Sequence, residues 1–205
     1  MKLTLRTKLA YGLAGMGDGA AYAITGSFLM FFLTTIVGIS PGVAGTIAAL
    51  GGVWEAFCGP IIGYLSDHTE TRWGRRKPFI FAAAFPLGVV TCLLFTTIDA
   101  SYGFRVFYYG LMTVIFWTSF SFFFVPYLSW GAELTRDYDE RTSIRTYSYV
   151  AQQLGLTLGM VLPTMIVDYL MHLGKTEAQG WHSVGLLVGI CAAVSLILGA
   201  PFHPQ

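Results

Sequence analysis

Two acidic residues stand inside long apolar stretches of this sequence, where a charged side chain is costly. Asp18 lies in the stretch 9–39 and Glu55 in the stretch 42–66. An ionisable side chain at mid-membrane costs at least roughly 2.5–3.5 kcal/mol, so each residue is a candidate for function. About ten residues separate each carboxyl group from the basic end of its stretch, which is a depth of roughly 15 Å, near the middle of a ~30 Å hydrocarbon core. Matching depth predicts a shared cation or a bound proton; the alternative is that hydroxyl groups cap each acid or that it stays protonated.

Uncharged polar residues occur at membrane depth in two other apolar stretches. Gln152 follows Tyr149 by one helical turn in the stretch 146–171, and Ser121 lies in the stretch 104–130. An amide both donates and accepts hydrogen bonds, which suits a hydroxyl-rich solute; hydrogen bonding between helices is the alternative. The expected solute is small and polar, a carbohydrate by default. The residues predicted to bind it are Asp18, Tyr22, Tyr127, Tyr149 and Gln152.

Six apolar stretches are long enough to hold these residues inside a membrane. A spanning helix needs roughly 20 mostly apolar residues, and the candidates are 9–39, 42–66, 78–97, 104–130, 146–171 and 181–200. Only 11% of the 205 residues are charged, whereas a soluble domain has about 25%. Glycines in the first two stretches predict close helix packing, the alternative being a helix break beside the buried acid. The predicted fold class is an all-α membrane protein with six transmembrane helices.

The basic residues between the apolar stretches predict the orientation. Ten of the 12 Lys and Arg residues fall on the side of the N-terminus, and Arg105 and Lys175 fall on the other side. Positive residues favour the cytoplasmic side, so we expect a multi-pass protein of the plasma (inner) membrane with both termini in the cytoplasm. The lipid bilayer is its expected surroundings, and no nucleic-acid partner is expected.

Charged residues concentrate in two of the connecting segments. The segment 63–78 places an acid at the end of one stretch and a basic cluster before the next, so Asp67 is expected to pair with an arginine. A second charged loop is predicted over 133–145. Ion pairs in these loops would latch one conformation; the alternative is that the charges only anchor the topology. The predicted gating residues are Asp67, Arg72, Arg75, Arg76 and Arg141.

Four segments carry a resemblance to known transporters. They are Lys8-Leu9-Ala10-Tyr11-Gly12, Trp54-Glu55-Ala56 with Pro60 and Gly63, Thr71-Arg72-Trp73-Gly74-Arg75-Arg76-Lys77-Pro78, and Pro126-Tyr127-Leu128-Ser129 with Arg141. Over essentially its whole length the chain resembles the major facilitator superfamily, and within it the glycoside–pentoside–hexuronide:cation symporters, the melibiose permease family. Members of that family have about twice this length, so the resemblance implies that the chain is the N-terminal six-helix bundle, with the C-terminal bundle missing.

The resemblance also implies a solute cavity between two bundles, alternating access, and a cation site on the second and fourth helices. It places Glu55 on the first carboxylate of that site and Ser121 on a hydroxyl position. The chain departs from the pattern at Cys58, Gly59 and Phe124, where the family has further polar or acidic groups. The predicted cation-coupling residues are Glu55, Ser121 and Cys58. A proton is favoured over sodium, because sodium needs several oxygen ligands and a proton needs one carboxyl group.

The sugar contacts of the family are also replaced in this chain. The family's sugar-binding acid falls at Gly19, next to Asp18, and its basic sugar contact falls at Tyr149. The predicted function is symport of a sugar or glycoside with a cation, H⁺ or else Na⁺, without a cofactor or a bound metal. A less polar or amphipathic solute is the alternative, as is a truncated fragment that does not transport. A membrane enzyme is disfavoured, because no metal-ligand spacing and no nucleophile–base pair occur at mid-depth.

Overall fold

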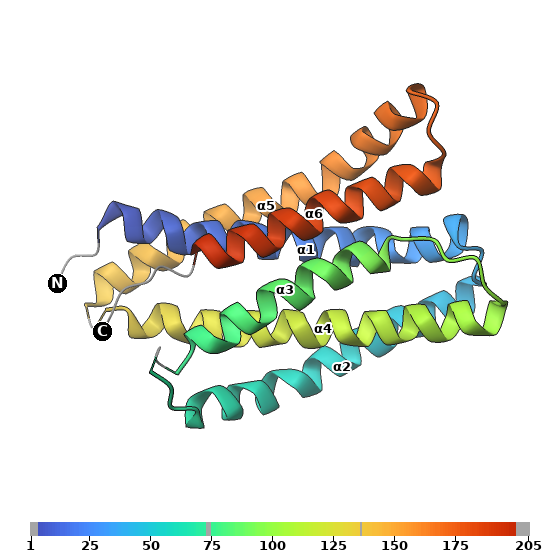
Figure 1. Cartoon of the computed structure of the whole chain (residues 1–205). Helices are drawn as coiled ribbons and strands as arrows, with labels where there is room; N and C mark the ends of the chain where they lie inside the picture. Colours follow the sequence, from blue (N-terminus) through green and yellow to red (C-terminus); the bar gives the residue numbers. More distant parts are fainter. Residues whose placement is uncertain (1–3, 73–74, 136, 200–205) are drawn as a thin grey trace.

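Six long helices, joined by short connections, make up the described part of the chain (Figure 1). The computed structural model describes residues 4–72, 75–135 and 137–199. The helices are α1 (Leu5–Phe31), α2 (Pro41–His68), α3 (Lys77–Leu94), α4 (Tyr102–Glu133), α5 (Tyr138–His172) and α6 (Glu177–Gly199), and a π-helical turn, η1 (Phe32–Ile36), extends α1. Each of the six is long and apolar enough to cross a membrane, so the predicted fold class is confirmed.

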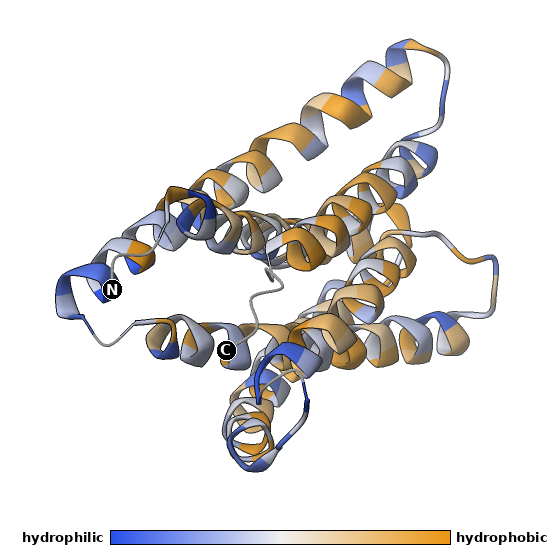
Figure 2. Cartoon of the chain, turned by 60° about the vertical axis from the view of Figure 1, so that its left-hand side comes forward, coloured by the Kyte–Doolittle hydropathy of each residue, from blue (hydrophilic) through white to orange (hydrophobic). Residues whose placement is uncertain are grey.

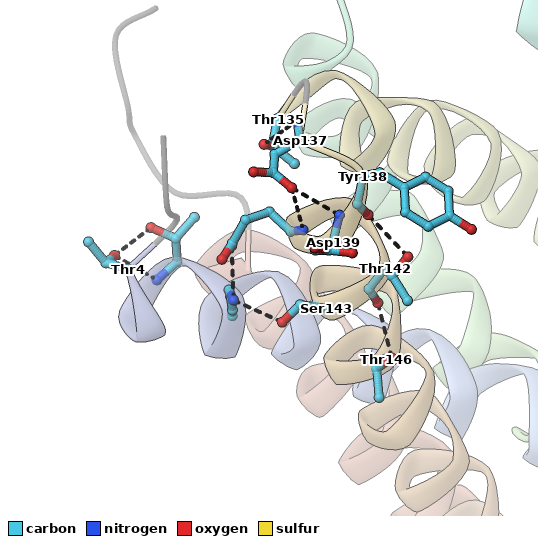
Figure 3. Close-up of polar contacts among 11 residues, drawn as sticks. Thr4, Thr135, Asp137, Tyr138, Asp139, Thr142, Ser143 and Thr146 are labelled. Atoms are coloured by element: carbon cyan, nitrogen blue, oxygen red, sulfur yellow. Dashed lines mark hydrogen bonds and ion pairs between the residues drawn. The ribbon is translucent and has the colours of Figure 1, made fainter.

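The largest difference from the predicted stretches lies between α4 and α5. The predicted charged loop over 133–145 is wrong in its extent, because α4 continues to Glu133 and α5 already begins at Tyr138. Asp137 caps α5: its carboxylate accepts hydrogen bonds from the backbone N–H groups of Asp139 at 2.9 Å and Glu140 at 3.4 Å (Figure 3). An acidic cap stabilises a helix start in water, so the helix extends beyond its apolar part.

The connection between α1 and α2 is short. The chain turns at Gly38, whose φ of 78° suits glycine. Pro41 is already the first residue of α2, a position where its missing N–H costs no helical hydrogen bond.

The helices pack in two groups of three that meet along α3 and α6. In one group α1 lies along α5 and α6, and in the other α4 lies along α2 and α3 (Figure 1). Hydrophilic residues gather at the two ends of the bundle, and the lengths between them are mainly hydrophobic (Figure 2). This distribution is what a protein that crosses a bilayer requires.

Glycines bring α1 and α5 into close contact, as the packing interpretation predicted. A Cβ atom added to Gly155 would overlap the backbone oxygen of Met16, and one added to Gly19 would overlap the backbone oxygen of Gln152. The interpretation fails for two glycines of α2: nothing within 4 Å would meet a Cβ on Gly52 or Gly59. The helix is unbroken at both positions, so neither glycine marks a break.

The helices α2 and α5 keep most of their apolar surface uncovered within the described chain. Only 22% of the most apolar window of each is buried, against 44–50% for the other four helices. Leu154 and Met165 on α5 and Phe57 and Ile61 on α2 are among the exposed side chains. Apolar faces of this size need lipid or a further protein surface to cover them.

Candidate solute and coupling site

The close approach of α1 and α5 joins two residues that the sequence singled out separately. Asp18 has no exposed surface, and the Nε2 atom of Gln152 donates a hydrogen bond of 2.8 Å to its Oδ2 atom. The Oδ1 atom of Asp18 is also buried and has no hydrogen-bond partner among the described residues. Glycine at position 19 makes this pair possible, because any larger residue would push the α5 backbone away.

A pair of stacked tyrosines lies close to Asp18 and connects α1 to α4. The rings of Tyr11 and Tyr127 are 4.3 Å apart at an interplanar angle of 16°. Each hydroxyl donates to the backbone oxygen of the other residue, at 3.0 Å from Tyr11 and 2.8 Å from Tyr127. The Tyr127 hydroxyl is also 2.7 Å from the Ser148 hydroxyl, so the pair joins α1, α4 and α5 through polar groups.

A cavity of about 280 Å³ opens beside this network between α4 and α5. Its lining consists of Tyr127, Leu128, Arg145, Ser148, Tyr149 and Gln152. The structure therefore brings together three of the predicted solute contacts, Tyr127, Tyr149 and Gln152. The other two fall elsewhere: Asp18 lies behind Gln152, and Tyr22 packs edge-on against Trp117 at 5.7 Å without lining this cavity.

Sequence reasoning did not single out Arg145 and Ser148 as candidates. Arg145 was counted among the basic residues that set the orientation and was placed in the predicted charged loop, because the helix was expected to begin at residue 146. Residues 145, 148, 149 and 152 follow the i, i+3, i+4, i+7 spacing of one helix face. This spacing could have identified Arg145 and Ser148 from the sequence. It includes Arg145 only when the helix begins before residue 145, as α5 does at Tyr138.

The predicted cation-coupling residues lie on α2 and α4. Glu55 is partly buried and makes no hydrogen bond to another described residue. Cys58 and Ser121 are 7% and 2% exposed. The two helices run in the same direction, and Trp54 of α2 donates a 2.8 Å hydrogen bond to Thr118 of α4. This register puts Cys58 and Ser121 at a similar level, about one turn further along.

One arginine ties together the ends of three helices at the end of the bundle where α1 begins. Arg76 donates a 2.7 Å hydrogen bond to Ser66 of α2 and contacts Glu133 of α4 at 3.2 Å. It also forms an ion pair with Asp67, which confirms the expected pairing of Asp67 with an arginine. Only 10% of the Arg76 side chain is exposed.

The other predicted gating residues are placed differently. Arg72 and Arg75 are exposed and form no ion pair with a described residue, and Trp73 and Gly74 of the same motif lie outside the described part. Arg141 was predicted in a loop but lies in the first turn of α5, where it donates to the Thr135 backbone oxygen at 3.4 Å. The reason is again the early start of α5.

A second ion pair at the same end was not predicted from the sequence. Lys8 of α1 lies 2.9 Å from Glu140 of α5, and it donates a 2.8 Å hydrogen bond to Ser143; the start of α5 is shown in Figure 3. Both charged side chains are about 13–14% exposed. The partners are more than a hundred residues apart in the sequence, so no local pattern could pair them.

Comparison with known proteins identifies the family of this six-helix bundle. The family model described as "MFS/sugar transport protein" matches residues 10–201. The chain belongs to this family. The family consists of membrane transporters rather than enzymes, and the predicted resemblance to the glycoside–pentoside–hexuronide:cation symporters is confirmed.

Several relatives cover most of the chain. It is 29% identical to the isoprimeverose transporter of Lactiplantibacillus pentosus over 91% of its own length and 39% of the relative's. It is 29% identical to the putative glycoside/cation symporter YagG of Escherichia coli over 95% of its length and 42% of the relative's. It is 30% identical to the sodium-dependent lysophosphatidylcholine symporter 1 of Gallus gallus over 81% of its length and 31% of the relative's. The chain thus spans well under half of each of these relatives.

Proposed function

We propose that this chain acts, together with a second six-helix half, as a symporter that moves a sugar or glycoside with a proton. The single observation that carries the proposal is the polar cavity between α4 and α5, because it places hydrogen-bonding groups beside a buried acid within a transporter of the MFS/sugar family. The uncovered faces of α2 and α5 are the surfaces that would face the second half. Alternating access then follows from rocking of the two halves around the solute.

The solute is proposed to be a carbohydrate because of the groups that line the cavity. Gln152 and Ser148 can both donate and accept, Tyr149 adds an exposed hydroxyl group, and Arg145 adds donors. Two relatives are named as transporters of isoprimeverose and of glycosides. The relative from Gallus gallus is named for an amphipathic solute, which keeps such a solute as the second candidate. The polar lining of the cavity favours the carbohydrate.

The coupling ion is proposed to be the proton, with Glu55 as its exchange site. Glu55 lies on a helix that spans the bundle and is only partly buried, so water in an open cavity can reach it. The family positions for further cation ligands are Gly59 and Phe124 in this chain, and neither has a side-chain oxygen. Ser121 and Cys58 remain as polar neighbours on the same two helices.

The orientation is proposed from the charges at the two ends of the bundle. The end that carries Arg76, Lys8 and Glu140 would face the cytoplasm of a plasma membrane, with both termini on that side. Arg76 and Asp67 there would hold α2, α3 and α4 as one body during rocking, and Lys8 and Glu140 would do the same for α1 and α5.

Uptake into membrane vesicles tests this proposal. The complete transporter, with both halves, is placed in vesicles with either an inward proton gradient or an inward sodium gradient, and accumulation of radiolabelled isoprimeverose and a panel of simple glycosides is followed. Accumulation driven by the proton gradient supports the proposal. Accumulation driven by sodium alone, or uptake of lysophospholipid without uptake of any glycoside, contradicts it.

A further inference from the structure

The side chain of Gln152 stands between the solute cavity and Asp18. Its amide nitrogen donates to Asp18 Oδ2 at 2.8 Å, and the same residue lines the cavity. Asp18 has no exposed surface of its own. A solute in the cavity therefore meets Gln152 first, and the buried acid lies directly behind it.

A glutamine amide is suited to both forms of a carboxyl group. Its NH₂ group donates to a carboxylate, and its oxygen accepts from the O–H group of a protonated acid. When the nitrogen faces Asp18, as observed, the amide oxygen is directed elsewhere; when the oxygen faces Asp18, the NH₂ group is released for another partner. The two arrangements differ by a turn of the amide about its last bond.

We propose that Gln152 relays the protonation state of Asp18 to the solute cavity by this turn of its amide. The proposal rests on the proposed function, because it assigns the cavity a hydroxyl-bearing solute. A hydronium ion in the cavity gives up a proton and is left as water; the proton reaches Asp18 Oδ2 as the Gln152 amide moves aside, and the carboxylate becomes neutral. The amide turns, its oxygen accepts from the new O–H group, and its NH₂ group donates to a solute hydroxyl. Solute binding thereby follows the protonation state of Asp18, while the exchange of the driving proton stays with Glu55.

The surroundings of Asp18 make both states accessible. The unpartnered Oδ1 atom is buried, and a buried oxygen of a charged group without a hydrogen bond is costly. Glu55 on α2 is the other acidic group that interacts with Asp18. The hydrogen bond from Gln152 on α5 offsets the cost of the unpartnered oxygen, since it stabilises the carboxylate. This hydrogen bond is therefore the contact on which the charged form of Asp18 depends.

The other groups that face this site do not replace Gln152. From α1 and α4 the hydroxyl groups of Tyr11 and Tyr127 are near enough to interact with Asp18, but both donate to backbone oxygens. Arg145 on α5 interacts electrostatically with Tyr11. Ser195 of α6 lies beside Gly17, the residue that precedes Asp18. The Ser195 hydroxyl group donates to a backbone oxygen of its own helix.

Labelling with dicyclohexylcarbodiimide, which reacts with protonated buried carboxyl groups, tests the contact without any solute. The complete transporter in lipid nanodiscs is treated at neutral pH, and modification of Asp18 is measured by mass spectrometry. Gln152→Leu removes one hydrogen bond to a charged acceptor, so Asp18 should be labelled about tenfold faster. Gln153→Leu is the matched control, because Gln153 is exposed and its side chain has no partner among the described residues. Asp18 in this variant should be labelled at the rate of the parent. Equal labelling in all three proteins overturns the proposal.

Binding of isoprimeverose, measured by equilibrium dialysis at mildly acidic and mildly alkaline pH, tests the link to the cavity. The parent and Gln153→Leu should bind several-fold more tightly at acidic pH. Asp18→Asn has no titratable group at this position and should bind isoprimeverose with the same affinity at both pH values. Gln152→Leu should also show no pH dependence, and its affinity should be lower than that of the parent. A pH dependence that persists in Asp18→Asn overturns the relay. If the parent binds no carbohydrate at either pH, the proposed function fails, and the labelling result alone decides the relay.

Discussion

Tyr11 and Tyr127 exchange hydrogen bonds across the contact between α1 and α4, each hydroxyl donating to the backbone oxygen of the other residue. Backbone oxygens inside a helix normally accept only from their own helix, so these bonds use the second lone pair of each carbonyl group. The two rings stack at 4.3 Å between the same two residues. This single pair gives α1 and α4 a fixed register beside the candidate site.

Tyr127→Phe should destabilise the bundle by about 1–2 kcal/mol, because it removes the bond to Tyr11 and leaves the buried Ser148 hydroxyl without this partner. The ring and its stacking remain, so the loss reports the hydroxyl group alone. Thermal unfolding in detergent measures the effect, and Tyr138→Phe on the exposed start of α5 is the control. Equal midpoints for the two variants would contradict this role of the pair.

Gly155→Ala should cost about 1–3 kcal/mol, since the added methyl group overlaps the backbone of α1 at Met16 and overpacking carries a cost of this size. Gly59→Ala is the matched control on α2, where the added methyl group meets nothing within 4 Å. It should be neutral or slightly stabilising, because alanine favours a helix. The same unfolding measurement compares them, and a loss in Gly59→Ala as large as in Gly155→Ala would argue against close packing as the cause.

Arg76→Ala should destabilise the bundle by about 1–2 kcal/mol, less than for a fully buried pair because Asp67 and Glu133 are partly exposed. It removes the contacts to α2 and α4 at once, whereas Arg75→Ala removes an exposed side chain and should change little. The midpoints of thermal unfolding of the two variants are compared at low and at high salt. A midpoint for Arg76→Ala that matches that of Arg75→Ala would show that the cluster contributes nothing to stability.

The helices were predictable from the sequence, and their contacts were not. About 20 successive apolar residues predict a spanning helix, so each of the six helices could be predicted from its own segment of the sequence. The start of α5 was missed because its first turns are polar and are stabilised by the Asp137 cap rather than by apolar residues. The importance of Asp18 could also be inferred, since a charged residue inside an apolar stretch is rare, and the structure buries it completely.

The candidate site was predictable only in part, because its residues come from different helices. Tyr127, Tyr149 and Gln152 could be named as polar groups at membrane depth, but their gathering in one cavity depends on how α4 and α5 pack. The pairs Asp18–Gln152 and Lys8–Glu140 each join α1 to α5 across more than a hundred residues. No local spacing contains such information.

Single cysteines on the two ends of the bundle test the proposed orientation, after replacement of Cys58, Cys92 and Cys191. Lys175→Cys should react with a membrane-impermeant maleimide in intact cells, because the connection between α5 and α6 is expected outside. Arg75→Cys, in the connection between α2 and α3, should react only after the membrane is permeabilised. The reverse pattern would mean that the termini lie outside the cytoplasm.

The proton-coupling role of Glu55 is the central claim, and Glu55→Gln tests it, since the amide mimics a permanently protonated acid. Gln153→Leu serves as the control for a substitution at an exposed position. Two activities of the complete transporter are compared with radiolabelled isoprimeverose: accumulation driven by a proton gradient, and exchange of internal for external solute without a gradient. The deciding measurement is the ratio of these activities in Glu55→Gln. We predict that accumulation falls to the level of equilibration while exchange is retained; accumulation on a proton gradient at the level of the parent would contradict the assignment.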